Sequence, residues 1–116
     1  KQLSELFDLP VQKPKVKTGW LAYPVINKKN SKIKRRDMQI FLEKKGIQTR
    51  TFFTGNILRQ PIMKNKIFKK VKQCSVNSDN IMKNGILIGC HQGLNNKEIN
   101  YIFNSINSYL KKFKII

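Results

Sequence analysis

The sequence predicts an α+β fold, in which a small sheet of about three strands is flanked by helices. Three observations support this prediction. Of the 116 residues, 40% are apolar, which is enough for the hydrophobic core of one domain. Three apolar or alternating runs have the composition of β-strands, and two stretches carry an apolar stripe with helical spacing. These elements follow one another along the chain as strand, helix, strand, short helices, strand and long helix.

The first predicted strand lies in the segment TGWLAYPVI, which begins at Thr18. Apolar and aromatic residues occupy both alternating positions, as in a strand that is covered on both faces. Pro24 has no N–H to donate to a neighbouring strand. We therefore expect this strand to lie at the edge of the sheet or to end at Pro24.

A helix of about 10 residues is predicted next, a typical length for a globular protein. Met38, Phe41 and Leu42 have the i, i+3, i+4 spacing of one helical face, and Asp37 is placed early, where a negative charge favours a helix. Gly46 is the expected stop, because glycine readily adopts the left-handed conformation found after helices.

The second and third strands are predicted over residues 47–53 and 86–90. The former alternates with period two and is rich in β-branched and aromatic residues, whereas the latter is an apolar run bounded by glycine, typical of a central strand. Between them, residues 60–68 are interpreted as irregular or as a short helix. Ser78 is expected to cap a short helix that stops at Gly85.

The final helix has the strongest pattern in the sequence. Asn95 precedes Glu98 by three residues, which is the spacing of a capping box. One apolar helical stripe follows, formed by Ile99, Ile102, Phe103, Ile106, Leu110 and Phe113. Residues 1–17 are interpreted as the end of a preceding helix and a linker, and residues 18–116 as a small α/β domain. Since the chain begins with lysine inside a helical pattern, we expect it to be a fragment.

The charge of the chain allows two interpretations. Lys and Arg together number 24 and Asp and Glu number six, which gives a formal net charge of +18. Such a charge is typical of a nucleic-acid-binding module. However, the cations are spread along the whole sequence. Lys also far outnumbers Arg, although Arg is the side chain better suited to bind phosphate groups. A solvated lysine surface is therefore favoured, and nucleic-acid binding remains the alternative.

Several classes of protein are disfavoured by what the sequence lacks. No apolar run approaches the roughly 18 residues of a membrane span, and no signal peptide is visible, so we expect a cytoplasmic chain without membrane contact. Cys74 and Cys90 suggest neither a disulfide framework nor a metal site. With six acidic residues and one histidine, the chain has little from which to build acid–base machinery, and we assign it no catalytic residue.

Two short segments contain candidate binding residues. In TFFTGNILRQP (51–61), Gly55 permits a close backbone approach, Asn56 offers a donor and an acceptor, and Arg59 offers a planar fork for an anion. His91 follows the third strand in GCHQGL, where binding residues often lie. Residue types alone favour structural roles. These are a Gly-Asn turn with Phe52 and Phe53 in the core and Arg59 paired with a backbone carbonyl, and a hydrogen-bonded histidine.

Four segments in order resemble the C-terminal part of DegT/DnrJ/StrS-type nucleotide-sugar aminotransferases. They are WLAYPV (20–25), FLEKKGIQTR (41–50), FTGNILRQP (53–61) and IMKNGILIGCHQGLN (81–95). Within this family the chain resembles the 3-dehydratases that act on nucleotide-linked 4-keto-6-deoxyhexoses. The resemblance implies the C-terminal domain of a fold-type I pyridoxal-phosphate enzyme, with a mostly antiparallel sheet.

What the resemblance implies about function is specific. The complete enzyme would be a cytoplasmic homodimer that uses pyridoxal or pyridoxamine 5'-phosphate to make deoxy or amino sugars for lipopolysaccharide or related glycans. The cofactor would be bound by a large domain that this chain lacks, so the fragment alone would be inactive. Gly55, Asn56 and Arg59 would lie on a loop that faces the active-site cleft, and His91 would be a further substrate-binding residue. Gln92 departs from the family, in which proline is frequent after this histidine.

Overall fold

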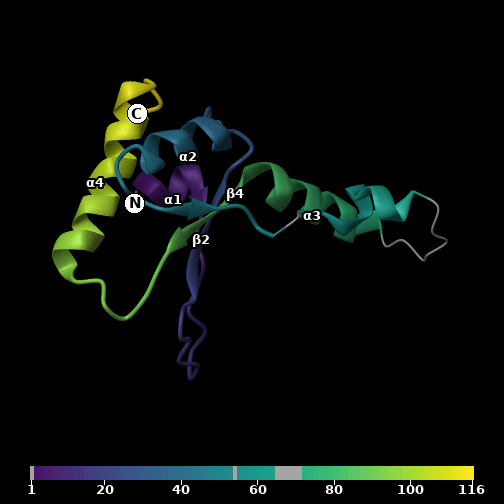
Figure 1. Cartoon of the computed structure of the whole chain (residues 1–116), viewed down its shortest axis with the longest axis horizontal. Coiled ribbons are helices and arrows are strands. Elements are labelled where there is room, and N and C mark those ends of the chain that lie inside the picture. Colours follow the sequence, from purple (N-terminus) through teal and green to yellow (C-terminus); the bar gives the residue numbers. More distant parts are fainter. Residues whose placement is uncertain (1, 54, 65–71) are drawn as a thin grey trace.

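The computed structural model describes residues 2–53, 55–64 and 72–116. Within these residues, four strands form one antiparallel sheet in the order β1-β2-β4-β3, and helices pack against it (Figure 1). The elements are α1 (Gln2–Leu6), β1 (Phe7–Asp8), β2 (Ala22–Asn27), α2 (Arg35–Glu43), β3 (Thr49–Arg50), the 3₁₀ turns η1 (Ile57–Arg59) and η2 (Pro61–Met63), α3 (Lys72–Asn84), β4 (Gly85–Gly89) and α4 (Asn96–Lys112). The predicted α+β class is confirmed, and β1 is an additional strand.

The hydrophobic core lies between one face of the sheet and the helices α2 and α4. Alternate residues of the two central strands point to the core, and their neighbours in sequence point to the other face. The buried apolar residues are Phe7, Val25, Ile33, Met38, Leu42, Ile47, Ile86, Ile88, Ile106, Tyr109 and Leu110. Because Phe7 belongs to this set, the first residues of the chain contribute to the same core as the rest.

Strand β2 continues through Pro24, so of the two expected alternatives the strand does not end there. Pro24 is paired in register with Leu87 of β4, and the strand runs on to Asn27. On its other side, β1 pairs only with Ile26 and Asn27. At Pro24 the strand is therefore locally an edge, which is where a residue without an N–H is tolerated.

Helix α2 and its stop are confirmed. Met38 and Leu42 are fully buried on its inner face. Gly46 has φ +74°, and the N–H of Ile47 donates to the carbonyl of Leu42 at 3.0 Å, which satisfies the end of the helix. The chain is thereby turned from the helix toward β3.

Strand β3 is much shorter than the predicted 47–53, because the chain turns immediately after it. The N–H of Gly55 donates to the carbonyl of Phe52 at 2.9 Å, which closes a turn. Phe53, in this turn, has φ +45° and is 90% exposed. The expectation that Phe53 is a core residue is wrong, whereas Phe52 is half-buried.

Helix α3 is longer than predicted and begins well before Ser78. Ser78 lies inside the helix, so the prediction that it caps a short helix is wrong. Gly85 is the first residue of β4, and the helix passes into this central strand without a connecting loop. A Cβ at Gly85 would lie 2.6 Å from both the Ile81 carbonyl oxygen and the Phe52 ring. Glycine is therefore needed here for close packing.

Helix α4 confirms the predicted capping box. The Asn95 side chain accepts hydrogen bonds from the N–H groups of Lys97 and Glu98, and the Glu98 carboxylate accepts one from the N–H of Asn95. Of the predicted stripe, Ile106 and Leu110 are buried, whereas three members are only half-covered: Ile99, Phe103 and Phe113. Tyr109, which the predicted stripe omits, is 1% exposed and packs at the centre of the core.

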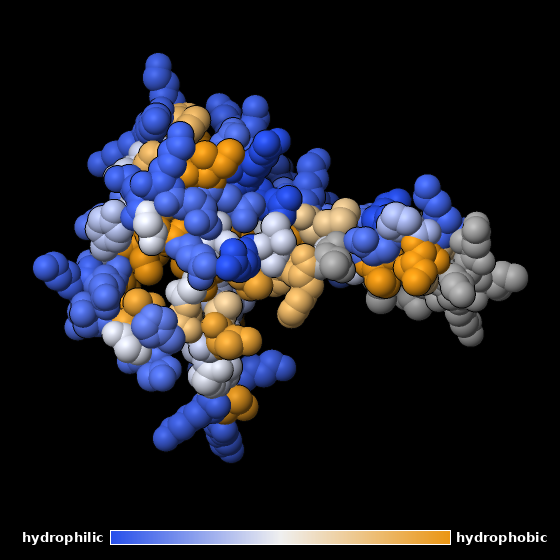
Figure 2. All heavy atoms as spheres, viewed as in Figure 1, coloured by the Kyte–Doolittle hydropathy of each residue, from blue (hydrophilic) through white to orange (hydrophobic). Residues whose placement is uncertain are grey.

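The molecule has a body and a protruding arm (Figure 1). The sheet, α2 and α4 form the body, while α3 with the turns η1 and η2 extends from it, so that the molecule measures 50 × 38 × 25 Å. Hydrophilic side chains cover most of the face of the body seen in Figure 2. Among the described helices, none is long and apolar enough to cross a membrane.

Candidate functional site

The predicted loop at Gly55 is pressed against helix α3. Gly55 has φ +78°, a conformation that favours glycine. A Cβ placed on it would lie 2.3 Å from Cγ and 2.7 Å from Sδ of Met82. Gly55 therefore lets the loop backbone approach α3 more closely than any other residue would. The structure gives it a role in packing the loop.

Asn56 fastens the loop to the same helix and is only 3% exposed. Its side-chain oxygen accepts from the N–H of Leu58 at 3.0 Å and so begins η1. Its side-chain nitrogen donates to the Asp79 carboxylate at 2.8 Å. Both ends of the amide are thus engaged inside the protein, and Asn56 positions the loop. Its predicted contact with substrate stays a prediction.

Arg59 forms a two-point ion pair with Asp79. The Nε–H of Arg59 donates to Oδ1 of Asp79 at 3.0 Å, and an Nη–H donates to Oδ2. The Arg59 side chain is 62% exposed and that of Asp79 30% exposed, so the pair lies at the surface of the arm. The planar fork fixes the direction of the guanidinium more firmly than a single contact would. In the structural interpretation Arg59 pairs with a backbone carbonyl, whereas the partner found is the carboxylate of Asp79.

The electrostatics of this pair are set by its hydrogen bonds. The bonds from Arg59 and then from Asn56 lower the pKa of Asp79 from an ordinary value of 3.8 to about 2. The same contact raises the pKa of Arg59. Both groups are therefore charged at neutral pH. We call Gly55, Asn56, Arg59, Asp79 and Met82 the arm cluster.

His91 lies apart from the arm cluster. Strand β4 separates them: its first residue follows α3, and His91 comes two residues after its last. His91 is exposed and lines the cleft beside α4, together with Gln48, Asn100 and Asn104. Its Nδ1 accepts from the N–H of Gly93 at 3.1 Å, which stabilises the turn. This bond requires that Nδ1 carry no proton. Of the four predicted site residues, Gly55, Asn56 and Arg59 lie together, whereas His91 lies in a different part of the structure.

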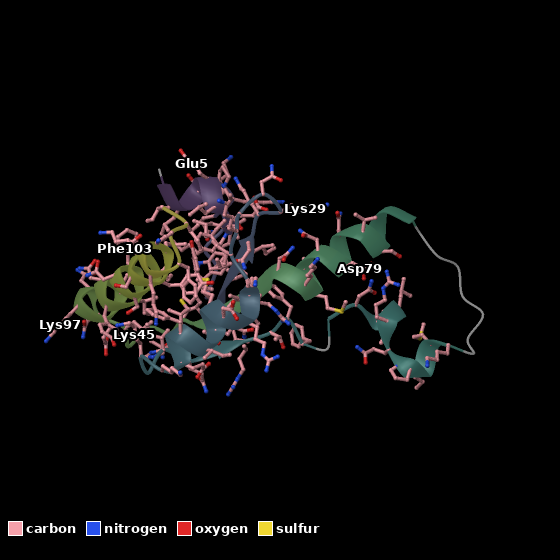
Figure 3. The ribbon with its side chains drawn as sticks, turned by 90° about the horizontal axis from the view of Figure 1, so that it is seen from above. Glu5, Lys29, Lys45, Asp79, Lys97 and Phe103 are labelled. Carbon is pink, nitrogen blue, oxygen red and sulfur yellow. The ribbon has the colours of Figure 1, made fainter. Side chains whose placement is uncertain are left out.

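Asp79 and Met82 are the members of this site that the sequence reasoning missed. They lie three residues apart and so share one face of α3. Figure 3 shows Asp79 on the arm, far from Phe103 on α4. The small number of acidic residues could have indicated Asp79. The chain has only six Asp and Glu residues against 24 Lys and Arg residues, so each carboxylate is a candidate partner for an ion pair. Nothing in the local sequence distinguishes Met82.

The described lysines do not fit a covalent anchor for pyridoxal phosphate. An anchoring lysine reacts as a neutral amine, which requires an enclosed site or a neighbouring cation. Every lysine whose side chain is described is exposed except Lys28. Lys28 is half-buried, and its Nζ donates to the Ser4 carbonyl at 2.7 Å and lies 3.8 Å from the Asp8 carboxylate. None of the lysines with a described side chain is therefore suited to hold the cofactor covalently.

Nearly the whole chain matches the model of one known protein family. The model of the DegT/DnrJ/EryC1/StrS aminotransferase family matches residues 1–107. The chain is also similar to the lipopolysaccharide biosynthesis protein RfbH of Salmonella typhimurium. The two are 29% identical over 106 residues, which are 91% of this chain and 24% of that protein.

Two further comparisons concern a 3-dehydratase. GDP-4-keto-6-deoxy-D-mannose 3-dehydratase of Escherichia coli O55:H7 is 30% identical over 94 residues, which are 81% of this chain and 24% of that protein. A solved structure of the E. coli GDP-4-keto-6-deoxy-D-mannose-3-dehydratase with bound hydrated PLP superposes with a TM-score of 0.70 and 26% identity, over 87% of this chain and 25% of that chain. The chain thus spans about a quarter of the length of these relatives, and its fold matches the C-terminal domain of fold-type I PLP enzymes.

Proposed function

Since the chain belongs to the DegT/DnrJ/EryC1/StrS aminotransferase family, we propose that it is the C-terminal domain of a longer enzyme of deoxysugar biosynthesis. The complete enzyme would act on a nucleotide-linked 4-keto-6-deoxyhexose, by 3-dehydration or by transamination, on the way to lipopolysaccharide or related glycans. Pyridoxal or pyridoxamine 5'-phosphate would be bound by the remainder of the enzyme. When bound, this cofactor acts as an electron sink. We further propose a cytoplasmic homodimer.

One observation carries this proposal. The similarity to a protein named as a 3-dehydratase covers most of the chain both in sequence and in three dimensions. It includes the arm and the sheet together, so it does not rest on one short motif. The name of RfbH supports a role in lipopolysaccharide biosynthesis. We propose no catalytic residue within this chain, which would be inactive alone.

Within the enzyme, we assign the arm cluster to substrate binding. Arg59 is the member that can reach a ligand, because its side chain is exposed and its orientation is fixed by Asp79. Gly55 and Asn56 would act by holding the loop against α3. His91 would contribute separately, from the cleft beside α4.

The proposal is tested by the turnover of sugar nucleotides by the complete enzyme. The wild-type enzyme, supplied with pyridoxamine phosphate, is expected to consume a 4-keto-6-deoxyhexose linked to GDP, CDP or dTDP. Arg59→Ala is expected to raise KM, and Arg36→Ala is the matched control because Arg36 is an exposed arginine on α2, which is not part of the arm. Absence of both cofactor absorbance and turnover in the folded wild-type enzyme would refute the proposal.

A nucleic-acid-binding module is the second candidate, and the net charge of +18 favours it. It predicts affinity for DNA or RNA whose logarithm decreases linearly with the logarithm of the salt concentration. A titration of labelled duplex DNA at low and at physiological salt distinguishes the candidates. A lysine surface that serves solubility would give only weak binding that is lost at physiological salt.

A further inference from the structure

The positive charge of Arg59 is already balanced inside the arm cluster. The Asp79 carboxylate accepts from two nitrogens of the guanidinium and from the amide of Asn56. It is one-third exposed, so it borders any ligand that reaches Arg59. A phosphate group placed there would meet a carboxylate as well as a guanidinium. The net attraction for an anion is therefore small.

Arg59 nevertheless retains hydrogen-bond donors that point away from Asp79. A guanidinium has five N–H groups, and the pair with Asp79 uses two of them. Among the described residues, no other hydrogen bond from the Arg59 guanidinium is found. Since the fork holds the plane of the guanidinium, the remaining donors have a fixed direction. Such a group suits a neutral oxygen, such as a hydroxyl or a keto oxygen.

Other cations near α3 lack such compensation. A depression between α3 and residues 28–33 is lined by Lys29, Lys83 and Asn80 as well as by Asp79. Within the described residues, no carboxylate lies within ion-pair distance of either lysine. If this region attracts phosphate, these lysines are better suited to it than Arg59.

We propose that Arg59 recognises the hexose of the nucleotide sugar, through a hydroxyl or keto oxygen, and does not bind its diphosphate. This inference rests on the proposed function, because it assumes that the arm cluster meets substrate. Asp79 is then a positioning residue, which directs Arg59 and cancels its charge. The substrate oxygen must be neutral, because the pair offers directional donors with little net charge.

The test compares two ligands on the complete enzyme. A panel of 4-keto-6-deoxyhexoses linked to GDP, CDP or dTDP identifies the nucleotide sugar that is turned over. The free nucleoside diphosphate of that sugar then serves as a competitive inhibitor that lacks the hexose. Arg59→Ala is expected to raise KM for the nucleotide sugar by about 10–100-fold, the loss for one charge-assisted hydrogen bond. The inhibition constant of the nucleoside diphosphate should stay within about twofold of wild type.

Two further measurements separate charge from direction. Arg59→Gln keeps a neutral donor that can bond to both Asp79 and a sugar oxygen, so its KM should lie between those of wild type and Arg59→Ala. The ratio of the KM values of Arg59→Ala and wild type should also be unchanged between about 50 and 300 mM NaCl, because a contact with little net charge is hardly screened. Arg36→Ala is the control, and circular dichroism checks folding.

The inference is overturned by three results. An equal rise in KM and in the inhibition constant would assign Arg59 to the diphosphate. Unchanged values for both ligands would make the arm cluster purely structural. Arg59→Gln as impaired as Arg59→Ala, with a defect that shrinks at high salt, would show that the charge matters. Failure of the wild-type enzyme to turn over any sugar of the panel would instead refute the proposed function, on which the inference depends.

Discussion

Substitution of Gly55 by alanine tests whether the loop is built against α3 as described. The added methyl group would lie 2.3 Å from Cγ and 3.0 Å from Cβ of Met82. Both carbons are close to the helix backbone, so a rotation of the far end of the methionine cannot remove the overlap. The left-handed φ of +78° adds a second cost, because alanine disfavours it.

The magnitude follows from these two costs. The left-handed conformation costs about 1–2 kcal/mol for a residue with a Cβ. Overpacking of this kind costs about a further 1–3 kcal/mol. Gly46→Ala is the matched control, because Gly46 has a similar φ of +74° but nothing lies within 4 Å of its Cβ position. Gly46→Ala should therefore lose only the free energy that the left-handed conformation costs, about 1–2 kcal/mol.

The assay is urea unfolding of the wild type and the two variants, followed by circular dichroism. Gly55→Ala should lower the free energy of unfolding by about 2–5 kcal/mol, and Gly46→Ala by about 1–2 kcal/mol. The double variant with Met82→Ala should recover part of the loss caused by Gly55→Ala, since the contacts with Cγ and Sδ are then gone. Equal losses for Gly55→Ala and Gly46→Ala would contradict the close contact between the loop and α3.

Three other predictions concern stability. Asn95→Ala removes the capping box of α4 and should lower the free energy of unfolding by about 1 kcal/mol in urea titrations; no change would mean that the helix start is not a stable feature in solution. Asn27 is 1% exposed and its side-chain atoms have no partner among the described residues, so Asn27→Leu should raise the melting temperature, and a clear fall would reveal a missed polar partner. Because the folded pKa of Asp79 is about 2 against an ordinary 3.8, its contribution is complete above pH 3.8 and is lost as pH falls through 2. The stability of Asp79→Asn should therefore fall less than that of the wild type over this pH range, and parallel pH profiles would contradict the ion pair.

Features that depend on neighbours in sequence could be predicted well. The cap at Asn95 and the stop at Gly46 both depend on contacts within one helical turn, and both are found where expected. The central position of β4 also followed from its uniformly apolar sequence. These elements define most of the core.

The errors arise where distant residues decide the local structure. Phe53 is of a residue type that is common in strands. However, the loop must turn to reach α3, and this turn holds Phe53 in a left-handed conformation at the surface. Ser78 is a good capping residue that lies inside a helix, because α3 already begins at Lys72. Asp79 is 20 residues from Arg59, so no local spacing could pair them.

The direct passage from α3 into β4 has a mechanical consequence. Large rearrangements of protein elements usually use a few linking residues as a hinge. Asn84 ends the helix and Gly85 begins the strand, with the Phe52 ring packed against the glycine. Strand β4 in turn is bonded to neighbours on both sides. To swing α3, and with it Asp79, toward or away from a bound sugar, the protein would have to bend the middle of its sheet. We therefore expect Asp79 to hold the orientation of the Arg59 guanidinium as soon as the protein has folded, before any substrate binds.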